Sequence, residues 1–260
     1  MTESVSKLIS EIYDITDGNL HSFWLYGSVV IDDFRLGWSD IDFIALTNTQ
    51  ITENQAQKLV YLRQAMSQKE PENPYYRLFE GIIAEVTEYR KNRFTRLVYW
   101  GTSGQRICDK YTPDVFASLE LVRYGQVVYG EDERSIFSLP DRKEIVSAIK
   151  EHYETIRKYA RQTDERLYSC GWLLDIARCI YTLRHNDVIA KTDAGIWALE
   201  NHVFQDESAL RRTIEIRQNP LSAADDDTMH WLGNLGPTVQ RYADVLENEL
   251  EAVSFSATEH

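Results

Sequence analysis

Two short motifs near the N-terminus have residue types and spacing suited to phosphate chemistry. Gly27 and Ser28 follow an apolar run, and Asp40 and Asp42 come after the spacer 29–39. A strand that ends in Gly-Ser lets backbone N–H groups approach a phosphate closely, and the serine hydroxyl adds one more donor. Because Asp40 and Asp42 are two residues apart, a strand would point both carboxylates to the same face.

Asp40 and Asp42 together predict a site for a divalent cation. Neighbouring carboxylates repel each other, which raises the pKa of each unless a cation neutralises them, and Mg²⁺ with oxygen ligands is the usual cation. Nucleoside triphosphates bring Mg²⁺ with them. We therefore expect phosphate oxygens and the two aspartates to share metal ions on this face.

A third carboxylate would complete such a site, and Glu80 is the candidate. It opens the apolar run EGIIAEV, and an adjacent strand could place it beside the aspartates. There it would be a third metal ligand or the base that takes the proton from an attacking hydroxyl. Glu85 in the same run is the alternative, although it would point to the opposite face from Glu80.

The elements that must position these residues are predicted from hydrophobic periodicity. We expect an α/β N-terminal domain, a mixed sheet with flanking helices, over residues 1–135. An all-α helical bundle over residues 136–260 is expected to close the nucleotide and acceptor cleft. The N-terminal elements expected are helices at 1–15, 52–69 and 113–129 and strands at 20–26, 40–46 and 80–86. The C-terminal helices expected are 140–163, 166–185, 192–203, 206–217 and 223–252.

Composition narrows the partners that the protein would bind. Lysine and arginine total 28 against 41 aspartates and glutamates, a formal charge of −13, which argues against a nucleic-acid partner and favours a small cationic one. The sequence has neither a membrane-spanning apolar run nor a signal-peptide core, so we expect no membrane association and a cytoplasmic location. Its three cysteines have no C-x-x-C spacing that would indicate structural zinc.

The run LYGSVVIDDFRLGWSDIDFIAL, residues 25–46, carries a family resemblance. Gly-Ser, a spacer of this length and D-x-D on a strand resemble the nucleotidyltransferase superfamily that shares the DNA polymerase β fold. The fuller run further resembles the aminoglycoside adenylyltransferases that modify streptomycin and spectinomycin. The third acidic residue of that family lies about as far after D-x-D as Glu80 lies after Asp42, so the resemblance favours Glu80 over Glu85.

The resemblance continues into the helical part of the chain. Arg178, Lys191 and Trp197 hold positions where the family has an Arg, a Lys and a Trp. The family's Arg and Lys contact the triphosphate, which implies that Arg178 and Lys191 bind the nucleotide with Gly27 and Ser28. The stretch Asp164-Glu165-Arg166 resembles one that contacts the cationic drug, which implies that Asp164 binds the acceptor.

These features predict a Mg²⁺-dependent nucleotidyltransferase with ATP as co-substrate. It would transfer AMP to a hydroxyl of a small cationic acceptor, an aminoglycoside or aminocyclitol antibiotic. One alternative is an antitoxin-like nucleotidyltransferase that modifies a protein or a tRNA end, and the charge of −13 argues against tRNA. A second alternative is a non-catalytic nucleotide-binding regulator, which the presence of Asp40 and Asp42 disfavours.

Overall fold

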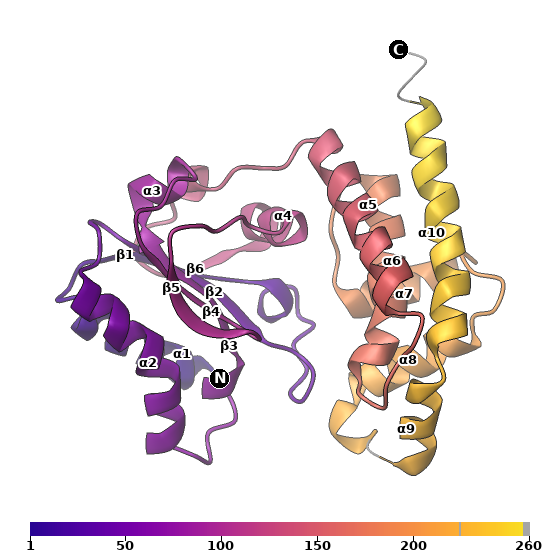
Figure 1. Ribbon diagram of the computed structural model, residues 1–260, viewed down its shortest axis with the longest axis horizontal. Helices are drawn as coiled ribbons and strands as arrows, with labels where there is room; N and C mark the ends of the chain where they lie inside the picture. The colour runs from indigo at the N-terminus through magenta and orange to yellow at the C-terminus, as the bar shows by residue number, and fades with distance from the viewer. Residues whose placement is uncertain (224, 257–260) are drawn as a thin grey trace. The chain divides into compact units, whose positions relative to one another are not determined.

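The computed structural model describes residues 1–223 and 225–256, and the chain divides into two compact units (Figure 1). The first unit comprises Met1–Val30 and Ser39–Leu139. The second comprises Ile31–Trp38 and the chain from Pro140 onwards. Nothing in the sequence pattern had indicated that Ile31–Trp38, in the middle of the predicted N-terminal domain, belongs with the helical unit.

The first unit is built on a six-stranded sheet with the order β5-β4-β3-β2-β1-β6. β2 and β3 are parallel, and all other neighbouring pairs are antiparallel. The strands are β1 (Leu20–Tyr26), β2 (Ile41–Thr47), β3 (Phe79–Glu85), β4 (Leu97–Gly101), β5 (Gly104–Cys108) and β6 (Gln126–Tyr129). The helices are α1 (Thr2–Ile15), α2 (Glu53–Lys69), α3 (Val86–Arg90) and α4 (Val115–Tyr124), with short 3-10 turns η1 (Gly27–Val29), η2 (Tyr76–Leu78) and η3 (Arg134–Ile136).

Helices cover both faces of this sheet, which is why its central strands are apolar almost without alternation. On one face the indole of Trp100 donates to the carbonyl oxygen of Leu59 in α2 at 3.1 Å. Phe43 packs edge-on against the same indole, with ring centroids 5.5 Å apart. On the other face Trp24 lies in a buried cluster with Leu121 of α4. Within β2 and β3, the polar side chains therefore lie near the strand ends.

Three strands were missed in the sequence, and one predicted helix is too long. The helix expected at 113–129 ends at Tyr124, because Gly125 breaks it and Gln126–Tyr129 pairs with β1 as an edge strand. β4 and β5 form a hairpin of only five residues each. Strands this short carry too few alternating positions to be recognised by periodicity.

The second unit consists of helices, as predicted. They are α5 (Arg142–Tyr159), α6 (Tyr168–His185), α7 (Lys191–Glu200), α8 (Ser208–Gln218), α9 (Asp226–Gly233) and α10 (Gly236–Ser256), with the 3-10 turn η4 (Pro220–Ser222). The prediction of a single helix at 223–252 is wrong, because α9 ends at Gly233 and a separate helix, α10, begins at Gly236. Asp225 caps α9 by accepting from the backbone N–H of Thr228 at 2.9 Å.

α6 is the central helix of this unit. It is buried on most of its circumference and contacts α5, α7, α8, α9 and α10. Its charged residues Asp175 and Arg178 occupy the part of its surface that stays partly open. Within the described part of the chain, no helix has the length and apolarity needed to cross a bilayer.

Candidate active site

The turn after β1 brings the backbone close to the first candidate carboxylate. Gly27 has a φ of +70°, and a Cβ built on it would lie 2.3 Å from Oδ2 of Asp42. A side chain at this position would clash with the carboxylate and strain the backbone, so both the turn and the contact require glycine. The Ser28 hydroxyl donates to the carbonyl oxygen of Asp40 at 3.4 Å. The Gly-Ser turn is therefore in direct contact with both aspartates.

The candidate acidic residues lie side by side across β2 and β3. Asp42 is the register partner of Glu80 on the parallel strand and of Tyr26 on the antiparallel one. Ile41 is fully buried whereas Asp40 and Asp42 are partly exposed, so the alternation of the chain places both aspartates on one side. The structure thus brings Glu80 beside the aspartates, on the neighbouring strand where the sequence predicted it.

Electrostatics distinguish Glu80 from an ordinary surface glutamate. Burial, and then the charge of Asp40, raise the pKa of Glu80 to about 7, while the guanidinium of Arg63 acts in the opposite direction. Arg63, in α2, donates to the carbonyl oxygen of Phe79 at 2.8 Å, directly before Glu80. A carboxylate with a pKa near neutrality is suited to accept a proton from a hydroxyl.

Arg63 was not identified from the sequence. Its position in α2 gives no motif, and only the fold brings it near Glu80.

Glu85, the alternative to Glu80, has a structural role. It precedes α3, and its carboxylate accepts from the backbone N–H groups of Thr87 at 2.9 Å and Glu88 at 2.7 Å. These two bonds satisfy donors that the first turn of a helix leaves unpaired. Glu85 also lies at the opposite end of β3 from Glu80, beside Thr47 of β2 and away from the position of Asp42.

In the second unit Arg178 and Lys191 converge on one carboxylate, that of Asp175. Nζ of Lys191 lies 2.8 Å from Oδ1 of Asp175, and Nη2 of Arg178 lies 3.8 Å from the same oxygen. Burial works against ionisation of Asp175, but the charges of Lys191, Arg178 and His152 outweigh it and lower its pKa to about 2. The sequence predicted the two cations but missed Asp175, although it stands one helical turn before Arg178.

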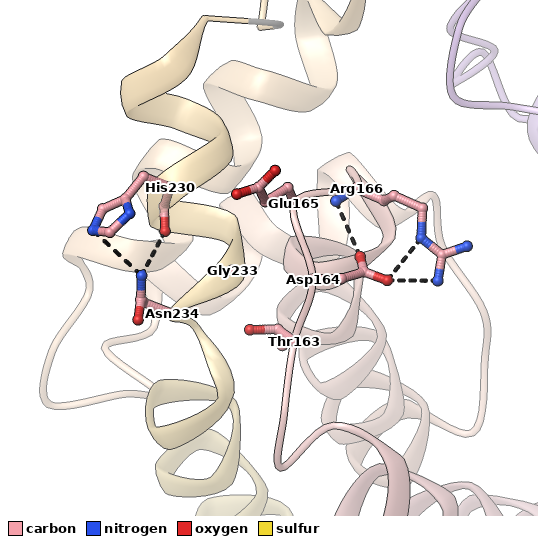
Figure 2. Close-up of a pocket in the computed structure, with 7 residues that line it drawn as sticks. All are labelled: Thr163, Asp164, Glu165, Arg166, His230, Gly233 and Asn234. Carbon is pink, nitrogen blue, oxygen red and sulfur yellow. Dashed lines mark hydrogen bonds and ion pairs between the residues drawn. The ribbon is translucent and has the colours of Figure 1, made fainter.

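Asp164 lies at a pocket before α6, within the second unit (Figure 2). The cavity has a volume of about 600 Å³, and its lining consists of Thr163, Asp164, Glu165, Arg166, His230, Gly233 and Asn234. The Asp164 carboxylate is half exposed and pairs with Arg166, whose Nε donates to Oδ2 at 2.7 Å. That bond and a backbone N–H lower the pKa of Asp164. A cationic ligand would therefore have to share this carboxylate with Arg166.

The carboxylates of β2 and β3 offer the hard oxygen donors that Mg²⁺ prefers. In the described residues, no three Asp, Glu, His or Cys side chains are grouped closely enough to make a ready-formed metal site. Mg²⁺ in nucleotide sites binds through one or two carboxylates together with substrate phosphates. Asp40 and Asp42 fit that arrangement, and Mg²⁺ remains a prediction.

Comparison with known proteins supports the family predicted from the sequence. Residues 135–244 match the family model for the C-terminal domain of aminoglycoside adenylyltransferases. The helical part of this chain is therefore similar to the C-terminal domain of those enzymes. The matched segment of the adenylyltransferase domain contains Arg178, Lys191, Asp175 and Asp164.

A solved structure shows the same fold over both units. It is spectinomycin adenyltransferase AAD(9) from Enterococcus faecialis, determined with ATP and spectinomycin. The similarity covers 95% of this chain and 99% of that chain, with a TM-score of 0.64 and 19% sequence identity. A search of the curated proteins finds no match. The predicted fold class and enzyme class are confirmed: the chain is a nucleotidyltransferase with an adenylyltransferase-type helical domain.

Proposed function

We propose that the protein transfers AMP from ATP to a hydroxyl group of a small cationic antibiotic, an aminoglycoside or aminocyclitol. The observation that carries the proposal is the pairing of Asp42 with Glu80 across β2 and β3, directly beside the Gly27 turn. A phosphate-binding turn, a pair of aspartates and a glutamate with a pKa near 7 are the groups that such a transfer needs.

In the reaction we propose, Glu80 accepts the proton of the acceptor hydroxyl, whose oxygen forms a bond to the α-phosphorus of ATP. The bond from that phosphorus to the bridging oxygen of the β-phosphate breaks, and pyrophosphate leaves. Gly27 and Ser28 bind phosphate oxygens through the turn. Asp40 and Asp42 would hold Mg²⁺, which would neutralise negative charge on the phosphates.

Arg178 and Lys191 are proposed to bind the triphosphate. Both are cations on partly open side chains that face one carboxylate, so their donors are already directed toward an anionic group. Charge-assisted hydrogen bonds to phosphate are among the stronger polar contacts in proteins. Asp175 would then hold the two cations in place before the nucleotide arrives.

Acceptor recognition is proposed to involve Asp164 and the negative field of the whole chain. The net charge of −13 would concentrate a cationic acceptor near the protein. Spectinomycin is the first acceptor to test, because AAD(9) was crystallised with it. ATP is abundant in the cytoplasm, the compartment expected from the sequence.

The test is pyrophosphate release by the purified protein. The protein is incubated with Mg²⁺, each of the four nucleoside triphosphates, and separately spectinomycin, streptomycin and other aminoglycosides. We expect release only with ATP, Mg²⁺ and a drug, together with a drug product heavier by one AMP in mass spectrometry. Pyrophosphate release without a drug, together with attachment of the nucleotide to a protein or tRNA, would favour the antitoxin-like activity. Nucleotide binding without turnover on any acceptor would contradict the proposal.

A further inference from the structure

Asp33 and Arg217 form an ion pair that is almost completely buried. Nη2 of Arg217, in α8, donates to Oδ2 of Asp33 at 2.7 Å, and each side chain is 3% exposed. Nε of Arg217 donates to the same oxygen at 3.1 Å. The carboxylate comes from the segment Ile31–Trp38, which separates the Gly-Ser turn from the D-x-D motif in the sequence.

The same carboxylate caps α7. This helix begins at Lys191, and its own N-cap residue, Ala190, has no side chain that accepts a hydrogen bond. Asp33 replaces that acceptor. Its Oδ2 accepts from the backbone N–H of Thr192 at 3.3 Å, and its Oδ1 accepts from the Thr192 hydroxyl at 2.6 Å. Asp33 therefore fixes the residue that directly follows Lys191.

Two further contacts seat the segment Ile31–Trp38 on the helices. The Arg217 guanidinium lies over the Trp38 ring, 5.2 Å from its centroid. Gly37 has a φ of +93°, and a Cβ there would lie 2.6 Å from Cδ2 of Leu221 in η4. The segment is thus held near its start by Asp33 and at its end by Gly37 and Trp38.

Both ends of this segment run directly into the candidate site. Ile31 comes two residues after Val29, the last residue of the turn that contains Gly27 and Ser28, and Asp40 comes two residues after Trp38. A shift of the segment would therefore move the chain on either side of it. Catalytic geometry is sensitive to displacements of about 1 Å, which can lower turnover roughly a hundredfold.

We propose that Asp33 is a positioning residue for the transfer reaction, an inference that rests on the proposed function. It acts through Lys191 by fixing the first turn of α7, and through Asp40 by fixing the chain just before D-x-D. A contribution to stability alone is a poor explanation for the pair, because replacing a buried ion pair with apolar residues is often neutral or stabilising. Its hydrogen bonds to the Arg217 guanidinium and to the N–H and hydroxyl groups of Thr192 instead fix the position of the segment relative to α7.

The test is a double-mutant cycle on nucleotide affinity. Dissociation constants for Mg²⁺-ATP are measured by calorimetry for the wild type, Asp33→Asn, Lys191→Ala and the double variant. We expect Asp33→Asn to weaken binding about tenfold in the wild-type background but less than about twofold when Lys191 is already alanine. A purely structural role would give the same factor in both backgrounds, and that result would overturn the inference.

A matched control is the exposed pair between Arg212, also in α8, and Asp227. Its geometry is similar, with Nη2 to Oδ2 at 2.7 Å and the guanidinium over Trp231, but the Asp227 side chain is 85% exposed. Asp227→Asn should change affinity and turnover less than about twofold. Thr192→Val, which removes one hydroxyl and keeps the shape, repeats the cycle if Asp33→Asn does not fold. Unchanged affinity in Asp33→Asn or in this substitute would also overturn the inference.

The two proposals fail in different ways. A wild-type protein that binds no Mg²⁺-ATP would overturn the proposed function and, with it, the role of Asp33. A wild-type protein that transfers AMP while its Asp33 cycle is additive would overturn only the role of Asp33.

Discussion

Replacing Glu80 with glutamine tests the central chemical step. The amide has the shape of the carboxylate but cannot take a proton, so the variant should bind Mg²⁺-ATP within a few-fold of the wild type. Turnover should fall about a hundredfold to ten-thousandfold, the usual contribution of a positioned general base.

The pH dependence of kcat/KM gives a second, quantitative test of Glu80 as the general base. The pKa of Glu80 is raised to about 7 by burial and by Asp40, so roughly a tenth of the protein has the ionised base at pH 6 and roughly nine tenths at pH 8. Only the ionised form accepts a proton. The wild-type kcat/KM should therefore rise about tenfold between these pH values, and the rise should be absent in Glu80→Gln.

The assay is continuous pyrophosphate release at saturating acceptor, with ATP affinity measured separately by calorimetry. Glu85→Gln is the matched control, since it changes the same residue type on the same strand. Loss of its helix cap should lower the free energy of unfolding by about 1 kcal/mol and leave the folded enzyme active. A fully active Glu80→Gln would refute the assignment, and loss of nucleotide binding in that variant would make Glu80 a metal ligand instead.

Further predictions address the remaining groups. Asp42→Asn should lower Mg²⁺-dependent turnover more than about a hundredfold with the fold intact by circular dichroism, and near-normal activity would contradict the two-aspartate site. Gly27→Ala should reduce both thermal stability and turnover, because its Cβ would lie 2.3 Å from the Asp42 carboxylate; wild-type values for both would show that the turn adjusts freely. Lys191→Ala and Arg178→Ala should each weaken ATP binding about tenfold or more in calorimetry, and unchanged affinity in both would mean that they do not contact phosphate. Asp175→Asn should lower the free energy of unfolding by about 2 kcal/mol in urea titrations at pH 7, because the native pKa of about 2 lies below the usual value of 3.8. That stability is present above pH 3.8 and is lost as the pH falls through 2, so equal stability of the two proteins at pH 7 would contradict it.

Local patterns were sufficient to predict the residues of the first unit that lie together. Gly27, Asp42 and Glu80 were found because strand alternation and the neighbouring-strand geometry are regular over seven-residue strands. The Asp42–Glu80 register follows directly from the parallel pairing of β2 and β3. The helical unit was predicted for the same reason, since its helices are long enough to show a clear period.

Contacts between segments distant in sequence could not be predicted in this way. Asp33 and Arg217 are separated by 184 positions, and neither lies in a pattern that indicates a partner. Asp175 and Arg63 are single charged residues on amphipathic helices, where a solvated side chain is the ordinary expectation. The short strands β4, β5 and β6 depend on neighbouring strands for their hydrogen bonds, so their conformation is decided by tertiary pairing.

The segment Ile31–Trp38 belongs to the helical unit although the residues on both sides of it belong to the first unit. This arrangement limits how the two units can be separated. The chain passes from one unit to the other three times, after Val30, Trp38 and Leu139, so no single cut yields both units whole. A fragment that begins at Pro140 would leave the Arg217 guanidinium without its carboxylate and α7 without its cap. Chimeras that exchange the helical domain for that of a relative should therefore carry residues 31–38 from the same parent. Recombination at the apparent domain boundary after Leu139 would place Asp33 and its partners Thr192 and Arg217 in segments from different parents.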